Sequence, residues 1–417
     1  MTAASAPANP TRPDLGAVPV RPTRGWLAKA LVRRLVDRLP IRLRTPDGTV
    51  VGAGDGTSPL LEVRDPDAFW RRLEAHPKIG LGEGYMAGEW GVATGSDLGD
   101  ALTPFAAIVP DLVPRPLQAF RRVVDIALPA VHRNTLEGSR ANIAAHYDLS
   151  NDLFAHFLDP TMTYSSALFD PARPWSEQSL SDAQQRKVDA VLDAAGVTEG
   201  TRVLEIGTGW GELALRAAAR GAHVVSLTLS AEQAALARER VRAAGLHDLV
   251  DIRLQDYREA EGSFDAIVSV EMIEAVGEEY WPSYFAAIDR LLAPGGTACI
   301  QAILMSHDRF LATRNSFGWI QKYIFPGGLI PSLRAIDLVT GTHTHLRRRA
   351  TFSFGPHYAE TLRRWRERFL ATYDAIAGPG FDDQFKRRWE FYLAYCEAGF
   401  AAGYLDVAQL TFGKDQS

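Results

Sequence analysis

The segment VLEIGTGWGEL, residues 203–213, decides the fold of this chain. Its hydrophobic run predicts a buried strand, and the residues after Gly211 predict a helix. Between the two, Gly207, Gly209 and Gly211 have the spacing G-x-G-x-G, which lets the backbone turn sharply and lets a cofactor approach it. Such a loop indicates a nucleotide-type cofactor, and by itself it fits NAD, FAD or S-adenosylmethionine (SAM).

The sequence that follows alternates between strand-like and helical patterns. We expect strands at 223–229, 251–256, 264–270 and 296–303, and helices at 230–245 and near 281–292. This alternation predicts an α/β fold, in which helices cover both faces of a mostly parallel, Rossmann-like sheet. The ligand crevice is then expected at the carboxyl ends of the strands.

The length of 417 residues indicates more than one domain. Residues 1–20, rich in Pro, Ala and Thr, predict a disordered tail. We expect a small N-terminal α+β domain over 21–110, a proline-containing linker over 111–135, and the main domain over 136–417. Within the main domain, the aromatic stretch 304–340 is expected to form the roof of an apolar channel, with buried helical packing as the alternative.

Two features of the N-terminal domain stand out. Segment 24–44 has apolar residues at helical spacing, and there are eight Lys/Arg and one acid between Arg21 and Arg44. This pattern favours a basic amphipathic helix on an anionic lipid surface, and it equally fits the first helix of a small domain. The glycine-rich run 78–90 predicts tight turns and close backbone packing, and it lacks the GK[ST] of a phosphate loop.

Composition excludes several classes of protein. A net charge of −5 gives no global basic field, so we expect no nucleic-acid partner. The sequence has no run of about 18 apolar residues, so no membrane-spanning helix is predicted, and no signal peptide is recognisable. Cys299 and Cys396 are too few for a disulfide framework, which favours the cytoplasm. No His/Cys/Asp cluster has metal-ligand spacing, so no metal is expected.

Local features favour SAM over the dinucleotides. Glu205 lies two residues before the first glycine, where a carboxylate can meet the cationic methionine end of SAM. Asp256 and Tyr257 follow the third strand, where a carboxylate and an aromatic ring fit beside an adenine. The second strand ends in Thr228 and Ser230, without the acid that usually holds a ribose.

Seven segments, in order along the chain, together resemble the cyclopropane fatty acid and mycolic acid cyclopropane synthase family. They are HYDLSNDLFAHFLDPTMTYSSALF (146–169), VLEIGTGWGEL (203–213), LTLSAEQ (227–233), SVEMIEAVG (269–277), KYIFPGGLIPS (322–332), FGPHYAETLRRW (354–365) and FYLAYCEAGF (391–400). The N-terminal GLGEGYMAGEW is also similar to the small extra domain of the longer, phospholipid-modifying members.

The resemblance implies a SAM site whose residues are carried over position by position. The residues that close over SAM match Tyr164 and Ser165, and the glycine loop matches Gly207, Gly209 and Gly211. The polar residues after the second strand match Thr228 and Gln233, and the residues at the adenine end match Asp256 and Tyr257. Aromatic residues in the matched segments fit the stabilisation of a carbocation. These are Tyr147, Tyr164, Phe169, Tyr358 and Tyr395.

The family's catalytic centre is matched only in part. In the family a bicarbonate ion acts as general base, held by main chain near a Cys and by Glu, His and Tyr side chains. The resemblance matches the Glu to Glu274 and the Tyr to Tyr358, whereas the Cys is Ser166 here and the His is Gln301. A further family cysteine, sometimes regarded as catalytic, matches Cys396.

Glu271 is a further departure, because the family usually has a small residue there. It lies three residues before Glu274, and on a helical turn the two carboxylates would face each other, which would raise the pKa of one. Glu271 is therefore a candidate substitute base, and its charge would repel bicarbonate. Bicarbonate is retained only as the weaker alternative.

The resemblance implies a SAM-dependent methyltransferase that acts on the cis double bond of an unsaturated phospholipid acyl chain through a carbocation. Gln301 and Glu271 suggest a methylene-branched product, the precursor of a methyl branch, and a cyclopropane is the alternative. Expected partners are the acyl chains, an anionic membrane surface at the inner face of the membrane, a reductase and a second copy of the chain. A small-amine methyltransferase and a non-catalytic SAM- or lipid-binding regulator remain alternative functions.

Overall fold

The computed structural model describes residues 15, 25–108, 151–378 and 380–414. The predicted linker, Tyr147 and nearly all of the predicted tail lie outside these residues. The chain divides into two compact units, which we describe separately. The first unit comprises 1–126, 316–324 and 365–402, and the second comprises 127–315, 325–364 and 403–417.

The second unit is built on a seven-stranded sheet of order β10-β11-β9-β8-β5-β6-β7. From β9 to β7 all neighbours are parallel, whereas β11 pairs antiparallel with both β9 and β10. The strands are β5 Arg202–Ile206, β6 His223–Thr228, β7 Val250–Leu254, β8 Phe264–Val270, β9 Leu292–Met305, β10 Leu346–Ser353 and β11 Leu405–Lys414. The predicted strands are confirmed, although β9 is several residues longer than expected.

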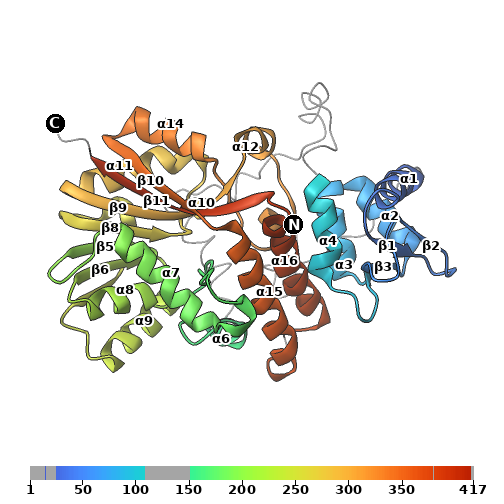
Figure 1. Ribbon diagram of the computed structural model, residues 1–417, viewed down its shortest axis with the longest axis horizontal. Coiled ribbons are helices and arrows are strands. Elements are labelled where there is room, and N and C mark those ends of the chain that lie inside the picture. Colours follow the sequence, from blue (N-terminus) through green and yellow to red (C-terminus); the bar gives the residue numbers. More distant parts are fainter. Residues whose placement is uncertain (1–14, 16–24, 109–150, 379, 415–417) are drawn as a thin grey trace, which may run out of the picture. The chain divides into compact units, whose positions relative to one another are not determined.

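Helices cover both faces of this sheet, as Figure 1 shows. Alternate residues of each strand point to opposite faces: Val203 of β5 packs with the helices of one face, and Leu204 packs with those of the other. One face carries α7 Leu180–Ala194, α8 Glu212–Ala219 and α9 Ala231–Ala243, and the other carries α11 Trp281–Leu291 and α14 Leu333–His343. The remaining helices are α6 Asn151–Phe157, α10 Ile273–Val276, α12 His307–Thr313 and the start of α15 Gly355–Thr372. The predicted Rossmann-like α/β class is thus confirmed.

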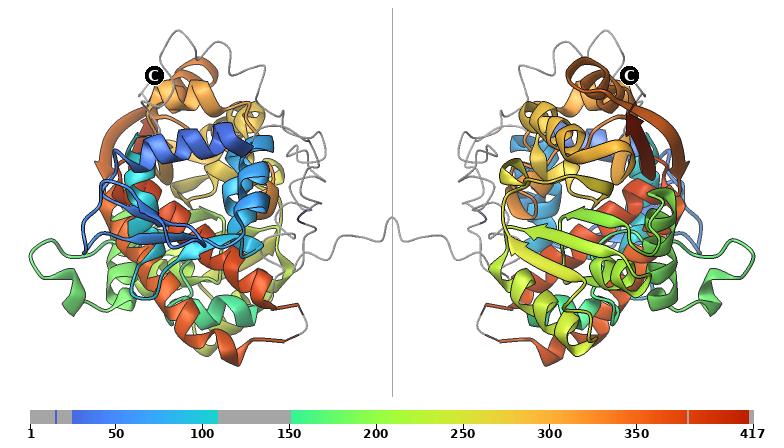
Figure 2. Two further views of the ribbon diagram at one scale, coloured as in Figure 1. Left: turned by 90° about the vertical axis from the view of Figure 1, so that its right-hand side faces the viewer. Right: turned by 90° about the vertical axis from the view of Figure 1, so that its left-hand side faces the viewer.

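The first unit contains a small sheet of order β2-β1-β3-β4, in which only β1 and β3 are parallel. The left view of Figure 2 faces this unit. Its elements are β1 Arg42–Arg44, β2 Val50–Val51, β3 Leu60–Val63, β4 Trp90–Val92, α1 Gly25–Val36, α2 Pro66–Ala75, α3 Pro77–Met86, α4 Leu98–Ile108, α13 Trp319–Tyr323, the end of α15 and α16 Asp383–Ala401. Its aromatic core joins segments that are distant in sequence, since Phe391 contacts Tyr85, Trp90 and Trp319.

The contact-defined units do not follow the boundaries expected from the sequence. Residues 316–324 and 365–402, which we had assigned to the main domain, pack within the first unit. The stretch 304–340 is therefore shared between the units. In its remaining part, Phe310 and Ile336 are buried in the core of the second unit, as in the alternative of buried helical packing.

The glycine-rich run 78–90 was predicted to form tight turns, and this prediction was wrong for most of it, because helix α3 occupies it as far as Met86. The expected close packing is confirmed. A Cβ added at Gly80 would lie 2.4 Å from the carbonyl oxygen of Arg72, and one at Gly82 would lie 2.4 Å from the indole nitrogen of Trp319. Gly80 and Gly82 therefore serve helix packing, whereas Gly88, at φ +76°, lies in the turn after α3.

No described helix is both long and apolar enough to cross a bilayer. The described residues also contain no group of three or more His, Cys, Asp or Glu side chains arranged to hold a metal ion.

A buried ion cluster in the first unit yields a stability prediction. Arg72 lies 3.2 Å from Glu83 and 2.8 Å from Glu89, and all three side chains are buried. Replacing Arg72 with Met leaves two buried carboxylates without this cation, so we expect a loss of about 3 to 5 kcal/mol in the free energy of unfolding, measured by urea denaturation. Arg44→Met, at the largely exposed pair with Glu62, serves as the control and should cost less than about 1 kcal/mol. Equal effects of the two substitutions would contradict this reading.

Candidate active site

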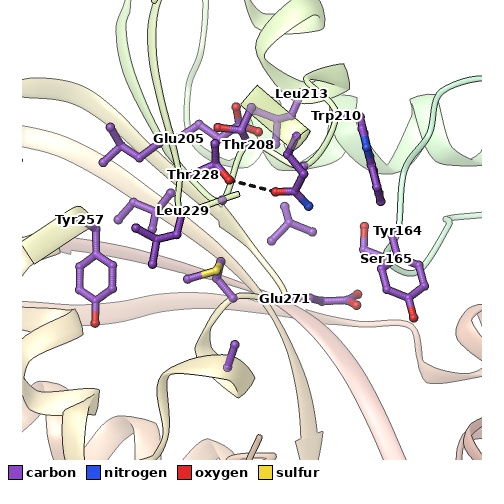
Figure 3. A pocket seen from close by; sticks show the side chains of 18 of the residues that line it. Tyr164, Ser165, Glu205, Thr208, Trp210, Leu213, Thr228, Leu229, Tyr257 and Glu271 are labelled. Carbon is purple, nitrogen blue, oxygen red and sulfur yellow. Dashed lines mark hydrogen bonds between the residues drawn. The ribbon is translucent and has the colours of Figure 1, made fainter. Parts of the chain in front are cut away.

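A pocket opens in the second unit at the carboxyl ends of β5, β6, β7 and β8 (Figure 3). Residues of the loops that follow these four strands line it, together with the segment 162–165 and two residues of α7, Lys187 and Val188. This is the edge of the sheet at which the strand order predicted a ligand crevice. Tyr257 lies toward one end of the pocket, and Tyr164, Ser165 and Glu271 gather toward the other.

The glycine loop after β5 uses left-handed backbone at all three glycines. The φ angles are +100° at Gly207, +52° at Gly209 and +90° at Gly211. A Cβ at Gly207 would lie 2.6 Å from Cγ of Met272, and one at Gly211 would lie 3.1 Å from Cβ of Ala237. Conformation and space therefore both require glycine at the first and third positions.

Glu205, near the end of β5, is a buried acid that lines the pocket. Burial raises the pKa of its carboxyl to about 8, against a hydrogen bond from Ser226 (2.5 Å) and the charge of Lys187. A cationic ligand beside Glu205 would favour its ionised form. The position suits the positive end of a cofactor.

The end of β6 is organised by polar side chains instead of an acid. Ser230 caps α9 by accepting from the backbone nitrogen of Gln233 (3.2 Å). The Thr228 hydroxyl donates to the Gln233 amide oxygen at 2.9 Å, drawn as a dashed line in Figure 3. The amide oxygen of Gln233 is thereby occupied, which turns its nitrogen into the donor that a ligand can use.

The residues expected at the adenine end also line the pocket. Tyr257 contacts Tyr284 edge to face, and burial raises the pKa of Tyr257 to about 12. The Asp256 carboxylate accepts hydrogen bonds from the guanidinium of Arg258 (2.6 and 2.8 Å). Arg258 was not anticipated, and it engages the carboxylate that the sequence had assigned to the cofactor.

Glu271 is the hub of the other end of the pocket. Its Oε1 accepts from the backbone nitrogen of Ser166 (3.0 Å) and from Nε2 of Gln301 (2.9 Å), and its Oε2 accepts from the hydroxyl of Tyr358 (2.6 Å). Burial raises the pKa of the Glu271 carboxyl, and these three hydrogen bonds and the charge of Lys187 oppose the rise. Because all three hydrogen-bond partners are donors, these bonds stabilise the carboxylate form of Glu271.

Glu271 and Glu274 do not share a helical turn, so that part of the prediction was wrong. Glu271 follows β8 with a left-handed φ of +51°, and α10 begins only at Ile273. Burial, and secondarily the charge of Glu271, raises the pKa of Glu274 to about 8. The expected rise in pKa therefore occurs at both acids, mainly through burial.

Glu274 lies behind the lining of the pocket. Its Oε1 accepts from the backbone nitrogen of Ile303 (2.5 Å), and its Oε2 is buried with no hydrogen-bond partner among the described residues. A carboxyl with this pKa is largely neutral at pH 7, and in this protonated form its O–H can donate a hydrogen bond. Glu274 and Glu271 thus occupy different electrostatic environments.

Cys396 belongs to α16 of the first unit, and it is not among the residues that line the pocket. Burial raises the pKa of its thiol to about 12, so a thiolate is not formed near neutral pH. Of the aromatic residues matched above, Tyr164 lines the pocket and Tyr358 bonds Glu271, whereas Phe169 stacks on Trp175 and Tyr395 is 47% exposed.

Sequence reasoning missed Lys187 of α7, which lines the pocket although its side chain is almost wholly buried. A signal was present in the sequence. Lys187 lies four residues after Ala183 and four before Val191, both buried, so it interrupts an apolar pattern with helical spacing. A lysine on such a face is worth testing as a site residue.

Comparisons with known proteins agree with this geometry. Residues 134–410 match the family described as mycolic acid cyclopropane synthetase. Tuberculostearic acid methyltransferase UfaA1 of Mycobacterium tuberculosis is 54% identical over 93% of this chain and 91% of its own length. The cyclopropane-fatty-acyl-phospholipid synthase of Escherichia coli K12 is 36% identical over 86% of this chain and 89% of its own.

Solved structures show the same relationship. The mycolic acid cyclopropane synthase CmaA1 complexed with SAH and CTAB has a TM-score of 0.59 and 32% identity, and the match covers 66% of this chain and 98% of that one. Coclaurine N-methyltransferase bound to N-methylheliamine and SAH has a TM-score of 0.56 at 17% identity, covering 80% of this chain and 99% of that one. This second likeness concerns the fold alone.

The glycine loop yields a prediction with an internal control. Gly207→Ala forces a side chain into φ +100° and against Met272, so it should lower the stability of the ligand-free protein by about 2 to 3 kcal/mol. Gly209→Ala, at φ +52° with nothing within 4 Å of the added Cβ, should cost only about 1 kcal/mol. Thermal denaturation measures both, and equal losses would contradict the assigned loop conformation.

Proposed function

The chain belongs to the mycolic acid cyclopropane synthetase family and is a SAM-dependent methyltransferase, and on this premise we propose that it methylates the cis double bond of an unsaturated phospholipid acyl chain. The proposed product is a methylene-branched chain. The names of the M. tuberculosis methyltransferase and the E. coli synthase support an acyl substrate, and that of the E. coli enzyme supports a phospholipid carrier.

The observation that carries the proposed chemistry is the hydrogen-bonding of Glu271. In the family, main chain near a Cys, a His and a Tyr help to hold the bicarbonate base. Here the corresponding donors, the backbone nitrogen of Ser166, the amide of Gln301 and the hydroxyl of Tyr358, all bond the carboxylate of Glu271. The carboxylate of Glu271 thus accepts the hydrogen bonds that the bicarbonate ion accepts in the family, which supports Glu271 as the general base.

The reaction balances with this single base. SAM supplies an electrophilic methyl group on a sulfonium centre. The alkene's electron pair bonds that methyl while the methyl–sulfur bond breaks and its electron pair stays on sulfur, which would release S-adenosylhomocysteine and leave a cation on the neighbouring carbon. A hydride shift moves the cation to the methyl-bearing carbon, a methyl proton passes to the carboxylate of Glu271, and the freed C–H pair becomes the methylene double bond. Tyr358 and Gln301 hold the carboxylate in place throughout.

The proposed choice of branch over ring depends on how the base is held. Ring closure requires the methyl proton to leave before the hydride moves. Three donors fix the Glu271 carboxylate in one position, so in this proposal it reaches the methyl proton more slowly than a mobile anion would. Slower proton loss gives the hydride shift time to occur.

The surface of α1 supports a peripheral site of action at the inner face of the membrane. Lys29, Arg33 and Arg34 are exposed on this helix around Leu31, which is 59% exposed. Such a surface attracts anionic lipid and can insert an apolar side chain. Conversion of the methylene to a methyl branch adds a hydride and a proton, so the proposal includes a separate reductase as a partner.

Lipid analysis tests the product. We expect the protein, given SAM and monounsaturated phospholipid vesicles, to add one CH2 to the acyl chain, and faster when the vesicles contain anionic lipid. Ozonolysis followed by mass spectrometry should cleave the product to a ketone, because a methylene branch is an alkene and a cyclopropane is not. A pure ozone-resistant product would contradict the methylene proposal. SAM binding without any lipid methylation would favour the small-amine or regulatory alternatives.

The base is tested by controlling bicarbonate. Wild-type activity should be unchanged in carbon-dioxide-free buffer, because Glu271 already occupies the donors. Glu271→Gln should lose at least about a hundredfold in kcat. Glu271→Gly vacates the donors and should become dependent on added bicarbonate. Glu239→Gln, at an exposed acid on α9, is the control; a bicarbonate requirement in the wild type would overturn the assignment.

A further inference from the structure

Lys187 is an ammonium group held inside the active-site wall. Its side chain is 1% exposed, it lines the pocket, and its Nζ donates to the hydroxyl of Ser165 at 2.6 Å. Among the described residues, Ser165 is the one hydrogen-bond partner of this Nζ. Lysine is almost never buried in this way unless its charge is compensated. The compensation identifies what the residue does.

Four acids act on Lys187, and two of them are set apart from the other two. The four come from different parts of the second unit: Glu205 of β5, Glu212 of α8, Asp159 after α6, and Glu271 after β8. Glu212 forms its own ion pair with Arg240 (2.8 Å). Asp159 accepts from the backbone nitrogen of Thr161 (3.0 Å) and is not among the residues that line the pocket.

The other two acids, Glu205 and Glu271, have only neutral hydrogen-bond donors. Ser226 donates to Glu205, and Ser166, Gln301 and Tyr358 donate to Glu271. Within the described part of the chain, Lys187 is the one cation whose charge acts on both carboxylates. The charge of Glu271 also acts on Glu274, where it contributes to the raised pKa of that acid.

We propose that Lys187 is a positioning residue that serves as the shared counter-charge of the pocket, favouring the ionised form of Glu205 when the cationic cofactor binds and the ionised form of Glu271 toward the substrate cation. Its hydrogen bond to Ser165 also fixes the segment whose next residue, Ser166, donates to Glu271. The part that concerns Glu271 rests on the proposed function.

The need for this charge follows from the substrate. An apolar acyl chain in the pocket excludes water, which favours a neutral carboxylic acid over a carboxylate. A protonated Glu271 cannot accept the methyl proton. Burial also lowers the pKa of Lys187 itself to about 8. Activity should therefore fall on the acid side as Glu271 gains a proton, and on the alkaline side as Lys187 loses one.

The test is the pH dependence of kcat/KM for lipid methylation. Lys187→Met should move the acid limb upward by about one pH unit or more, equivalent to about a tenfold loss below that limb, and should remove the alkaline limb near pH 8. Gln184→Met is the matched control on α7. It removes the hydrogen bond to the carbonyl of Ser165 (2.8 Å) without changing a charge, so both limbs should stay in place even if KM for SAM rises.

A binding measurement separates this inference from the proposed function. SAM carries a sulfonium charge that S-adenosylhomocysteine lacks, so weaker ionisation of Glu205 in Lys187→Met should lower the ratio of SAM to S-adenosylhomocysteine affinity, measured by calorimetry at pH 7. That readout stands even if the wild type methylates no lipid. The proposal would be overturned if Lys187→Met kept both limbs of the wild-type pH profile of kcat/KM and the wild-type ratio of SAM to S-adenosylhomocysteine affinity. If that variant does not fold, Lys187→Arg takes its place: it should keep the acid limb and lose the alkaline one, and an unchanged alkaline limb would overturn the proposal.

Discussion

Three hydrogen bonds to one carboxylate organise the active site of this methyltransferase. The donors, Ser166, Gln301 and Tyr358, come from a loop, a strand and a helix that lie far apart in the sequence. Only the completed sheet brings them to Glu271, because β9 places Gln301 beside the end of β8. The amide of Gln301 is in turn oriented by Gln409 on the opposite strand, β11. The antiparallel strand added to the parallel sheet thus supports the chemistry as well as the fold.

Electrostatics explains why this end of the pocket is built as it is. A buried carboxylate is stable only when donors or a cation surround it. Glu271 has three donors and Lys187, whereas Glu274, with a single backbone donor and a repelling neighbour, has a pKa raised to about 8. Burial thus raises the pKa of both acids, and hydrogen-bond donors oppose the rise more strongly at Glu271 than at Glu274.

Much of the second unit was predictable from the sequence, because its information is local. The hydrophobic run before Gly207 and the periodicity of the following helices specified strands and helices to within a few residues. Most of the residues expected at the cofactor line the pocket, and the sequence could place them there because many of them follow the strands directly. Family resemblance then selected SAM among cofactors that a glycine loop alone cannot distinguish.

What could not be predicted depends on tertiary contacts. The glycines of 78–90 indicated turns, because their spacing does not reveal that Arg72 and Trp319 pack against the helix that they form. The relation of Glu271 to Glu274 depends on a left-handed residue that no local pattern encodes. The charge of Lys187 acquires meaning only when acids from other strands surround it. The two-part division of 304–340 likewise follows from long-range packing.

The left-handed backbone at residue 271 has a consequence for how such enzymes diversify. Glycine adopts this conformation without strain, so a small residue and a glutamate are interchangeable there without rebuilding the loop. The glycine codon GGA and the glutamate codon GAA differ in one base. In the proposed mechanism, a single nucleotide change therefore exchanges a base borrowed from solution for one carried by the chain. Such a lineage would be released from the carbon dioxide level of its surroundings.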